Sequence, residues 1–457
     1  MMALLTVMEG MNLRIKILQG NCLDRLKDLE DQSINTCITS PPYWGLRDYG
    51  TTEWEGGDEN CDHVEPRQIR GKNSEKQSTN NHGEGGSAWK ICQKCGAVRK
   101  DSQLGLEETP EEFVENLVEV FREVKRVLKD SGTVWLNLGD SYASSGEVGK
   151  KDKQKYGGIS KVEHLHSGGV KGLPPKNLVG IPWRVAFALQ QDGWYLRQDI
   201  IWHKPNPMPE SVQDRCTKSH EYIFLLSKSP KYYFDNEAIK EDAVSDKDLG
   251  ILRSRKQAEL NHPSIIKRQE IGIDSTNAGD GKKNKRSVWT VTTKPFKEAH
   301  FATFPVDLIE PCVLAGCPEK VCVECDTPYE RKMEVIEVEP KKHTNISDNR
   351  KEFDSLMGGG GTSFKGRSGH FKKDGTPVVT PKKDLGFKKE CQCQTNETKA
   401  GTVLDPFGGS GTTAEVANKH NRNAVLIELN EEYIEMMKAR LVSPQEDMFN
   451  SVELEVV

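Results

Sequence analysis

The sequence predicts a layered α/β fold interrupted by two polar, cysteine-bearing insertions. Short apolar runs of strand length alternate with segments whose apolar residues recur at helical spacing, which is typical of such a fold. Late in the chain, a strand-like run leads through a glycine-rich turn into a helix. Between the apolar blocks lie long polar segments that could not form a core of their own. The ordered blocks are therefore expected at 13–52, 102–240, 291–318 and 400–442, separated by 53–101, 241–290 and 319–399.

The individual elements follow from local pattern. Apolar runs bounded by turn residues predict strands at 14–18, 34–38, 133–138, 195–202, 222–226, 402–404 and 425–427. Thr109-Pro110-Glu111-Glu112 fits a capping box with proline at the first helical position, and it begins a helix that runs to about Leu128. Asp130-Ser131-Gly132 is predicted to end that block before the next strand. Further helices are expected at 23–29, 181–190, 306–314 and, capped by Asn430, 431–441.

Composition restricts the class of protein. The net charge is −5, so no global basic field indicates nucleic acid, and any DNA-binding surface must be local. No apolar run approaches the roughly 20 residues of a membrane span, and the first seven residues lack the basic start of a secretory signal. The expected location is cytoplasmic. In such a reducing compartment, twelve cysteines indicate metal ligands before disulfides.

Two groups of cysteines have the spacing of structural zinc sites. Segment 53–101 holds Cys61-x-His63 and Cys92-x-x-Cys95, with His82 as an alternative to His63. Segment 319–399 holds Cys322-x-x-Cys325 and Cys391-x-Cys393, with Cys317 as a rival ligand. Because these segments are poor in apolar residues, a metal would supply folding energy that burial cannot. The alternative is that they are disordered insertions with incidental cysteines.

Ser40-Pro41-Pro42-Tyr43 follows the predicted strand 34–38 directly. Proline lacks an N–H donor and fixes φ, so two prolines end the strand at its carboxyl end, where open α/β sheets bind their ligands. The proline pair stiffens the turn and leaves carbonyl groups unpaired, between a small hydroxyl and an aromatic ring. These features suit the binding of a flat ring that carries an amine. The alternative is a plain Pro-Pro turn with a packed tyrosine.

The stretch Asp405-Pro406-Phe407-Gly408-Gly409-Ser410-Gly411-Thr412-Thr413 turns sharply from strand to helix. Glycine lets the backbone approach a ligand, and the start of a helix presents N–H donors. Glu428 ends the next strand, where a carboxylate can accept hydrogen bonds from two ribose hydroxyls. A nucleoside cofactor is therefore expected. Gly409-x-Gly411-x-x-Ala414 followed by Glu428 fits a nicotinamide dinucleotide almost as well as an adenosyl cofactor.

Taken together, the two motifs resemble those of the DNA amino-methyltransferases that use S-adenosylmethionine. The catalytic motif comes first and the cofactor motif last, which resembles the circularly permuted beta class of that family. Residues 127–140, 202–235 and 300–305 are similar to further family segments. The resemblance implies a Rossmann-like class I methyltransferase sheet with helices on both faces. It also implies double-stranded DNA as partner, a restriction endonuclease as candidate partner and no membrane, and it leaves oligomeric state open. Segment 241–290 becomes a candidate target-recognition region by exclusion.

The resemblance also implies roles for individual residues. Ser40 and the carbonyl of Pro41 would accept hydrogen bonds from the target amine, and Tyr43 would stack on a base flipped out of the duplex. Asp405 would orient the cofactor loop and Glu428 would hold the ribose. The methionine end of the cofactor would lie against Phe407, Gly408, Gly409, Gly411, Thr412, Thr303, Phe304 and Pro305. Where the family has an aspartate contacting adenine, this chain has Asn21, with Asp24 as a nearby substitute.

Serine at position 40 resembles the cytosine-N4 subgroup, whereas adenine-N6 enzymes more often have Asp or Asn there. Methylation of a ring carbon is disfavoured, because the Pro-Cys pair that it would need, Pro311-Cys312, lies in an apolar helical run. Two alternatives from other classes remain. One is a nicotinamide-dependent oxidoreductase, and the other is a non-catalytic, zinc-bearing nucleic-acid-binding module. RNA or protein as the methyl acceptor is a lesser option.

Overall fold

The computed structural model describes residues 13–45, 52–58, 60–63, 91–92, 94–101, 103–143, 173–242, 282–293, 304–335, 382–441 and 452–457. The chain divides into two compact units. The first comprises residues 1–235, 286–328 and 391–457, and the second comprises 236–285 and 329–390. Thr303 and His82 lie outside the described residues. Among the described helices, none has the length and apolar character needed to cross a membrane.

A nine-stranded sheet organises the first unit, in the order β10-β6-β7-β5-β2-β15-β16-β1-β17. Neighbouring strands are parallel except on both sides of β7, which therefore runs opposite to the others. The mixed sheet agrees with the predicted α/β methyltransferase-like fold. The strands are β1 (Leu13–Gln19), β2 (Ile34–Thr39), β5 (Leu128–Leu138), β6 (Tyr195–His203), β7 (His220–Ser227), β10 (Val288–Thr290), β15 (Thr402–Asp405), β16 (Asn423–Glu428) and β17 (Val452–Val456).

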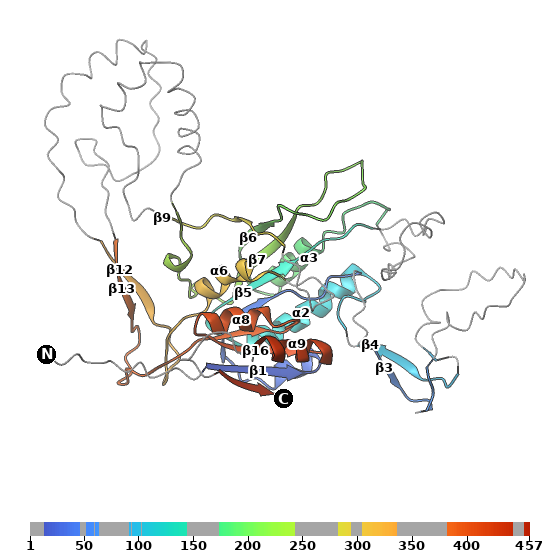
Figure 1. Ribbon diagram of the computed structural model, residues 1–457, viewed down its shortest axis with the longest axis horizontal. Coiled ribbons are helices and arrows are strands. Elements are labelled where there is room, and N and C mark those ends of the chain that lie inside the picture. The colour runs from blue at the N-terminus through green and yellow to red at the C-terminus, as the bar shows by residue number, and fades with distance from the viewer. Residues whose placement is uncertain are drawn as a thin grey trace, which may run out of the picture. The chain divides into compact units, whose positions relative to one another are not determined.

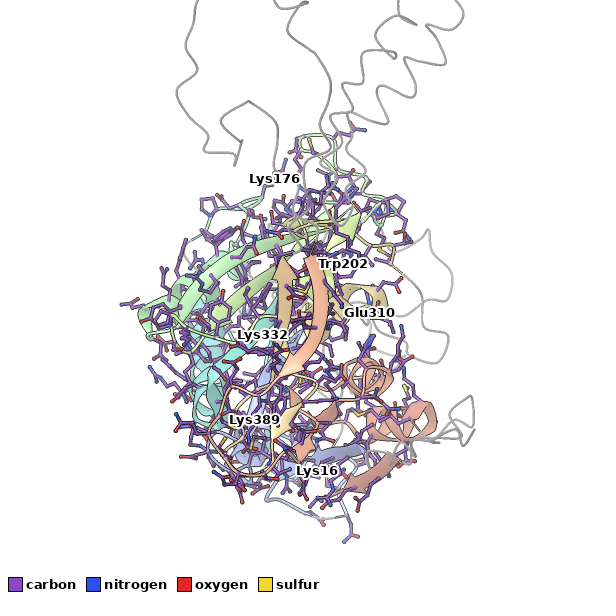
Figure 2. The ribbon with its side chains drawn as sticks, turned by 90° about the vertical axis from the view of Figure 1, so that its left-hand side faces the viewer. Lys16, Lys176, Trp202, Glu310, Lys332 and Lys389 are labelled. Carbon is purple, nitrogen blue, oxygen red and sulfur yellow. The ribbon has the colours of Figure 1, made fainter. Side chains whose placement is uncertain are left out.

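Helices cover both faces of this sheet. On one face α2 packs against α1, α3 and the sheet, and on the other α6 packs against α8, and α8 against α9. Figure 1 shows α8 and α9 lying over β16 and β1. Glu310 of α6, labelled in Figure 2, accepts a hydrogen bond from Lys419 of α8 at 2.7 Å. The helices are α1 (Cys22–Lys27), α2 (Pro110–Val127), α3 (Ile181–Gln191), α6 (Val306–Gly316), α8 (Thr412–Lys419) and α9 (Glu431–Leu441).

Helix α2 begins as its sequence predicts. The Thr109 hydroxyl accepts a hydrogen bond from the backbone N–H of Glu112 at 3.2 Å, and Pro110 is the first helical residue. The apolar residues of α2, Phe113 and Phe121 among them, are fully buried against the sheet. This packing supplies most of the stability of such an amphipathic helix.

Helix α2 ends at Val127, close to the predicted end, but the predicted break at residues 130–132 before the next strand is wrong. Strand β5 begins at Leu128, directly after α2, and continues through these residues. Its register against β2 shifts between the Ile34–Leu128 and Thr36–Thr133 pairs. Extra residues on one strand are accommodated as an irregularity of the ladder, so polar turn formers need not end the strand.

Several short strands were not predicted. In the main sheet these are β10, with three residues, and β17, which pairs with β1 near the end of the chain. Short edge strands give a weak apolar signal because one side of the ladder faces solvent. Small two-stranded pairs complete the first unit: β3 (Thr52–Glu55) with β4 (Val98–Asp101), and β11 (Val321–Cys322) with β14 (Thr398–Lys399).

The second unit also contains two antiparallel pairs among its described residues. They are β8 (Glu241–Asp242) with β9 (Lys282–Lys283), and β12 (Glu330–Val335) with β13 (Lys382–Lys388), the latter two labelled in Figure 1. A 3-10 helix, Glu237–Ile239, precedes β8. Most of segment 241–290 lies outside the described residues, while its last part, β10, pairs in the main sheet.

Candidate active site

The two sequence motifs meet at the carboxyl ends of adjacent parallel strands. β2 pairs with β15, with Thr36 opposite Val403 and Cys37 opposite Leu404. Beyond the last paired residues, the hydroxyl of Thr39 donates a hydrogen bond to Asp405 Oδ1 at 2.6 Å. Ser40 follows Thr39 directly, and the glycine-rich loop follows Asp405. This bond therefore joins segments that are 366 positions apart in the sequence.

Asp405 is a buried acid that holds several elements together. Its Oδ1 also accepts from the backbone N–H of Phe407 at 3.1 Å, and its Oδ2 accepts from the Thr413 hydroxyl at 2.6 Å. Burial raises the pKa of Asp405 to about 7, against the opposing effect of these hydrogen bonds. The carboxyl group thus fixes both the start of the loop and the first turn of α8.

The glycines between Asp405 and α8 serve different purposes. Gly409 and Gly411 have left-handed backbone conformations, with φ of 51° and 80°. Gly408 lies so close to Met437 of α9 that an added Cβ would stand 2.9 Å from the Met437 Cε atom. A side chain at 408 would therefore require the Met437 side chain to move and would press on Leu426. The loop keeps its backbone N–H groups at the carboxyl edge of the sheet.

Glu428 ends β16 beside this loop. Its Oε2 accepts from the Gly409 N–H at 2.8 Å, and its Oε1 accepts from the Asn430 N–H at 2.9 Å. Burial raises the pKa of this carboxyl group. A carboxylate has about four acceptor positions. Glu428 can therefore accept hydrogen bonds from a ligand hydroxyl in addition to those from the backbone.

On the other side of the Thr39–Asp405 bond, Asn137 of β5 organises the catalytic motif. Its Nδ2 donates to the backbone carbonyl of Tyr222 at 3.0 Å, so its Oδ1 faces the motif as an acceptor. The Ser40 hydroxyl donates to this Oδ1 at 3.3 Å. The Tyr43 hydroxyl lies 3.2 Å from the same atom and 2.9 Å from Glu221 Oε2.

Glu221 carries the charge of this network. The Lys204 ammonium pairs with its Oε1 and also lies 4.1 Å from the centre of the Trp202 ring. Trp202 (Figure 2) is buried in β6. Because the Tyr43 hydroxyl has one proton, the shorter bond to the Glu221 carboxylate takes it. The Ser40 proton then remains the donor to Asn137.

Gly139, just after β5, lies against the Tyr43 ring. A Cβ added at Gly139 would stand 2.5 Å from Tyr43 Cε2, so only glycine allows this contact. The ring is therefore held from two sides, by its hydroxyl and by this contact. Sequence reasoning did not identify Asn137, Gly139 or Lys204 as site residues. The one signal that could have indicated Asn137 is that it is a polar residue inside the apolar run 133–138.

The remaining predicted cofactor residues are placed as follows. The Asn21 side-chain oxygen accepts from the Leu23 N–H at 2.9 Å and caps α1. Asp24 is in the first turn of α1 and pairs with Lys27 at 3.3 Å. Pro305 caps α6 and follows Phe304. The buried Thr412 hydroxyl accepts from Arg440 of α9 at 3.0 Å, which fixes the start of α8.

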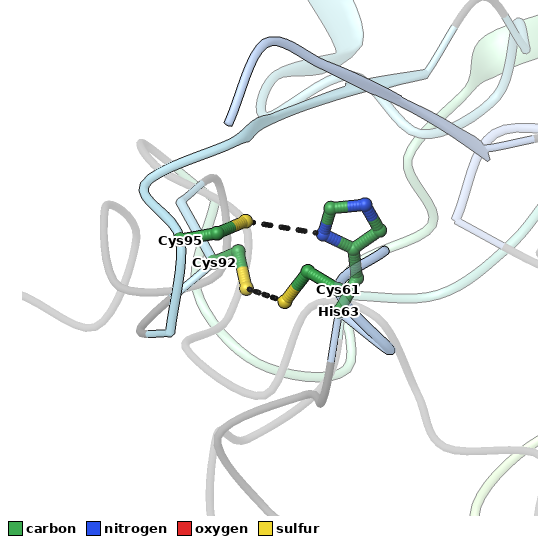
Figure 3. A group of neighbouring side chains, drawn as sticks. All are labelled: Cys61, His63, Cys92 and Cys95. Carbon is green, nitrogen blue, oxygen red and sulfur yellow. Dashed lines mark hydrogen bonds between the residues drawn. The ribbon is translucent and has the colours of Figure 1, made fainter. Parts of the chain in front are cut away.

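The structure also brings together the two groups of candidate metal ligands. In each group the four ligand atoms lie within 4.8 Å of one another: Cys61, His63, Cys92 and Cys95 in the first (Figure 3), and Cys322, Cys325, Cys391 and Cys393 in the second. Cys317 belongs to neither group. It is fully buried at the end of α6, where its Sγ faces the Pro318 carbonyl at 3.9 Å.

Comparison with known proteins agrees with this geometry. The profile of the DNA methylase family, which covers N6 and N4 amino-methyltransferases, matches residues 34–324 and 392–439. The chain belongs to this family. It is 34% identical over 434 residues to the Type II methyltransferase M.SmaI of Serratia marcescens, covering 94% of this chain and 92% of the relative. It is 33% identical to M.Cfr9I of Citrobacter freundii, covering 93% and 87%.

Among solved structures, the PvuII DNA methyltransferase (cytosine-N4-specific) is similar with a TM-score of 0.44 and 13% identity, over 98% of each chain. The family profile and the two Type II relatives show that the protein is a DNA amino-methyltransferase, and the family resemblance predicted from the two motifs is confirmed. The family favours methyl transfer over the nicotinamide-dependent and non-catalytic alternatives.

Proposed function

We propose that this enzyme transfers a methyl group from S-adenosylmethionine to the N4 amine of a cytosine flipped out of double-stranded DNA. The observation that supports this most strongly is the Thr39–Asp405 hydrogen bond. It sets the amine-binding motif and the cofactor loop side by side at one edge of the sheet. Direct transfer between two bound groups needs this kind of positioning and no covalent intermediate.

Ser40 is the proposed acceptor for the target amine. With its proton given to Asn137, the oxygen of Ser40 presents lone pairs to the pocket. The carbonyl of Pro41 is the second proposed acceptor, because its oxygen has two lone pairs for the amine hydrogens. Two acceptors bind both hydrogens of an exocyclic amine and direct its lone pair at the methyl group. Serine at position 40, in place of Asp or Asn, resembles the cytosine-N4 subgroup and favours cytosine N4 over adenine N6.

Tyr43 is the proposed stacking platform for the flipped base. Its hydroxyl is anchored by Glu221, whose charge is balanced by Lys204. Anchoring at the hydroxyl fixes the plane of the ring before the base arrives, which reduces the entropy lost on binding. Base–aromatic stacking contributes about 1–3 kcal/mol.

The residues of the glycine-rich loop and Glu428, in the other half of the site, fit an adenosyl cofactor. Glu428 would accept the ribose hydroxyls, while Phe407, Gly408, Gly409 and Gly411 would line the methionine part, with Asp405 orienting their loop. Thr412 supports this loop through α8. When bound, the cofactor supplies an electrophilic methyl group on a sulfonium. Asn21 or Asp24 at the adenine, and Thr303, Phe304 and Pro305 at the methionine end, complete the proposed site.

Relatives named Type II methyltransferases support site-specific modification of DNA. A restriction endonuclease of the same specificity is the partner that we propose on that basis. Segment 241–290 remains our candidate for target recognition.

Transfer of a labelled methyl group tests the proposal. Wild-type enzyme is incubated with duplex DNA and methyl-labelled S-adenosylmethionine, and the DNA is digested to nucleosides. We expect label in 4-methylcytosine, and its loss with Ser40→Ala. Ser33→Ala is the matched control, because Ser33 bonds only to the Glu30 carbonyl, on the surface before β2. Label in 6-methyladenine would refute the N4 assignment, and label in RNA or protein alone would refute DNA as substrate.

A further inference from the structure

The two cysteine groups share one backbone geometry, although they lie in different insertions. In the first, the Gly96 N–H donates to the Cys92 carbonyl at 2.8 Å, and the Cys92 N–H donates to the Ala97 carbonyl at 2.7 Å. In the second, the Asp326 N–H donates to the Cys322 carbonyl at 2.9 Å, and the Cys322 N–H donates to the Thr327 carbonyl at 3.0 Å. Both Cys-x-x-Cys sequences thus form the same closed turn.

The residue after each second cysteine has a left-handed conformation. Gly96 has φ of 74° and Asp326 has φ of 57°. Glycine adopts this conformation freely, and aspartate is one of the few other residues that adopt it with some frequency. In each turn, the two thiols point to the same side and meet the second ligand pair. The same turn recurring at two places in the chain indicates a common purpose.

In the first group, two distances between ligand atoms fit a tetrahedral ion. Zinc–sulfur bonds of about 2.3 Å place two sulfurs of a tetrahedron about 3.8 Å apart. Cys61 Sγ and Cys92 Sγ are 3.8 Å apart. With a zinc–nitrogen bond of about 2.0 Å, sulfur and nitrogen would be about 3.5 Å apart. Cys95 Sγ and His63 Nδ1 are 3.4 Å apart. A disulfide would need about 2.05 Å between sulfurs.

The surroundings of each group provide little other stabilisation. In the first group, Cys92 is the one buried ligand, and Trp54 stacks on the His63 ring with centroids 5.0 Å apart. In the second, Cys322 is the one buried ligand, and Asp326 is held by Lys129 of β5 at 3.0 Å. A cation bound between four such groups would stabilise their thiolates, which are the form of cysteine that binds metals.

We propose that the chain holds two structural zinc ions, one bound by Cys61, His63, Cys92 and Cys95, and one by Cys322, Cys325, Cys391 and Cys393. Each ion would be fully coordinated by protein, which is typical of structural and not catalytic zinc. Each would join two ligand pairs that lie far apart in the sequence, Cys61 and His63 with Cys92 and Cys95, and Cys322 and Cys325 with Cys391 and Cys393, and so lower the entropy of the unfolded chain between them.

The first ion would also support the catalytic motif. The segment that carries it leaves and rejoins the catalytic body beside Tyr43. There the Gly45 N–H donates to the Gly105 carbonyl at 2.9 Å, and the Trp44 ring donates to the Glu107 carbonyl at 3.0 Å. These bonds join Trp44 and Gly45, which precede the zinc-binding segment, to Gly105 and Glu107, which follow it. The zinc proposal does not depend on which base is methylated.

Metal analysis of the full-length protein tests the proposal. The protein is expressed with zinc in the medium, dialysed against a mild chelator, and analysed by mass spectrometry for metals. We expect two zinc ions per chain in the wild type, and one in either Cys95→Ser or Cys325→Ser. Cys216→Ser is the matched control, because Cys216 is exposed and belongs to neither group. It should retain two.

A second measurement does not depend on the folding of variants. In wild-type protein denatured with chelator but without reductant, all twelve cysteines should react with a thiol reagent. Fewer reactive thiols would indicate disulfides and overturn the proposal. A wild-type zinc content well below two, or a Cys95→Ser or Cys325→Ser variant that keeps two ions, would also overturn it for the group concerned.

Discussion

Replacing Thr39 by valine removes the hydrogen bond that joins the two halves of the site. Valine has almost the same shape as threonine, and Thr39 is 1% exposed, so the change leaves no cavity. What is lost is one 2.6 Å bond to Asp405 Oδ1. Because Asp405 also holds the Phe407 N–H, the cofactor loop loses part of its support.

The expected effect can be worked out from this geometry. A hydrogen bond to an ionised group contributes about 1.5–3 kcal/mol, and one to a neutral group about 1 kcal/mol. Burial gives Asp405 a pKa of about 7, so near neutral pH it is ionised about half of the time. We expect Thr39→Val to lower the free energy of unfolding by about 2 kcal/mol. We also expect S-adenosylmethionine affinity to fall about tenfold, equivalent to about 1.4 kcal/mol.

Urea unfolding and calorimetric titration with S-adenosylmethionine measure both effects. Thr36→Val is the matched control on the same strand. Thr36 is fully buried and bonds to Thr133, away from the loop. It should lose about 1 kcal/mol of stability and bind cofactor like the wild type. Wild-type affinity in Thr39→Val, or an equal loss of affinity in both variants, would refute the reasoning.

Three further predictions concern the same site. Tyr43→Phe keeps the stacking ring but loses the bond to Glu221, so its kcat should fall about tenfold. Tyr43→Ala also loses the ring, so its kcat should fall at least tenfold further. Equal losses of kcat in the two variants would contradict this. Gly139→Ala would press a Cβ against the Tyr43 ring, so kcat should fall at least tenfold with cofactor affinity unchanged in titrations. The pKa of Asp405 is raised from about 3.9 unfolded to about 7, so its stabilising contribution is full below pH 4 and is lost as pH rises through 7. Wild type should therefore lose about 2–3 kcal/mol more than Asp405→Asn between pH 5 and pH 8 in urea unfolding, and parallel curves would contradict this.

The sequence was sufficient to predict the parts of the site that depend on local backbone chemistry. Two prolines after an apolar run end the strand, and the glycines within residues 408–411 allow the chain to turn sharply into a helix. The ends of two strands at Asp405 and Glu428 could also be predicted, because each acidic residue directly follows an apolar run.

The residues that orient the motif could not be predicted in the same way. Asn137 meets Glu221 only because β5 and β7 are antiparallel, with Leu138 opposite Tyr222. That register is set by tertiary packing. The contact of Thr39 with Asp405 likewise depends on the pairing of β2 with β15, which the local sequence around Thr39 does not indicate. Edge strand β17 was missed although Val452–Val456 alternates apolar and acidic residues.

Hydrogen exchange tests directly whether the two distant segments form one site. Amide exchange is measured by mass spectrometry with and without S-adenosylhomocysteine. We predict slower exchange in peptides covering residues 407–413 and also in those covering 39–45. Slower exchange in the first set alone, with the second unchanged at saturating ligand, would contradict the account.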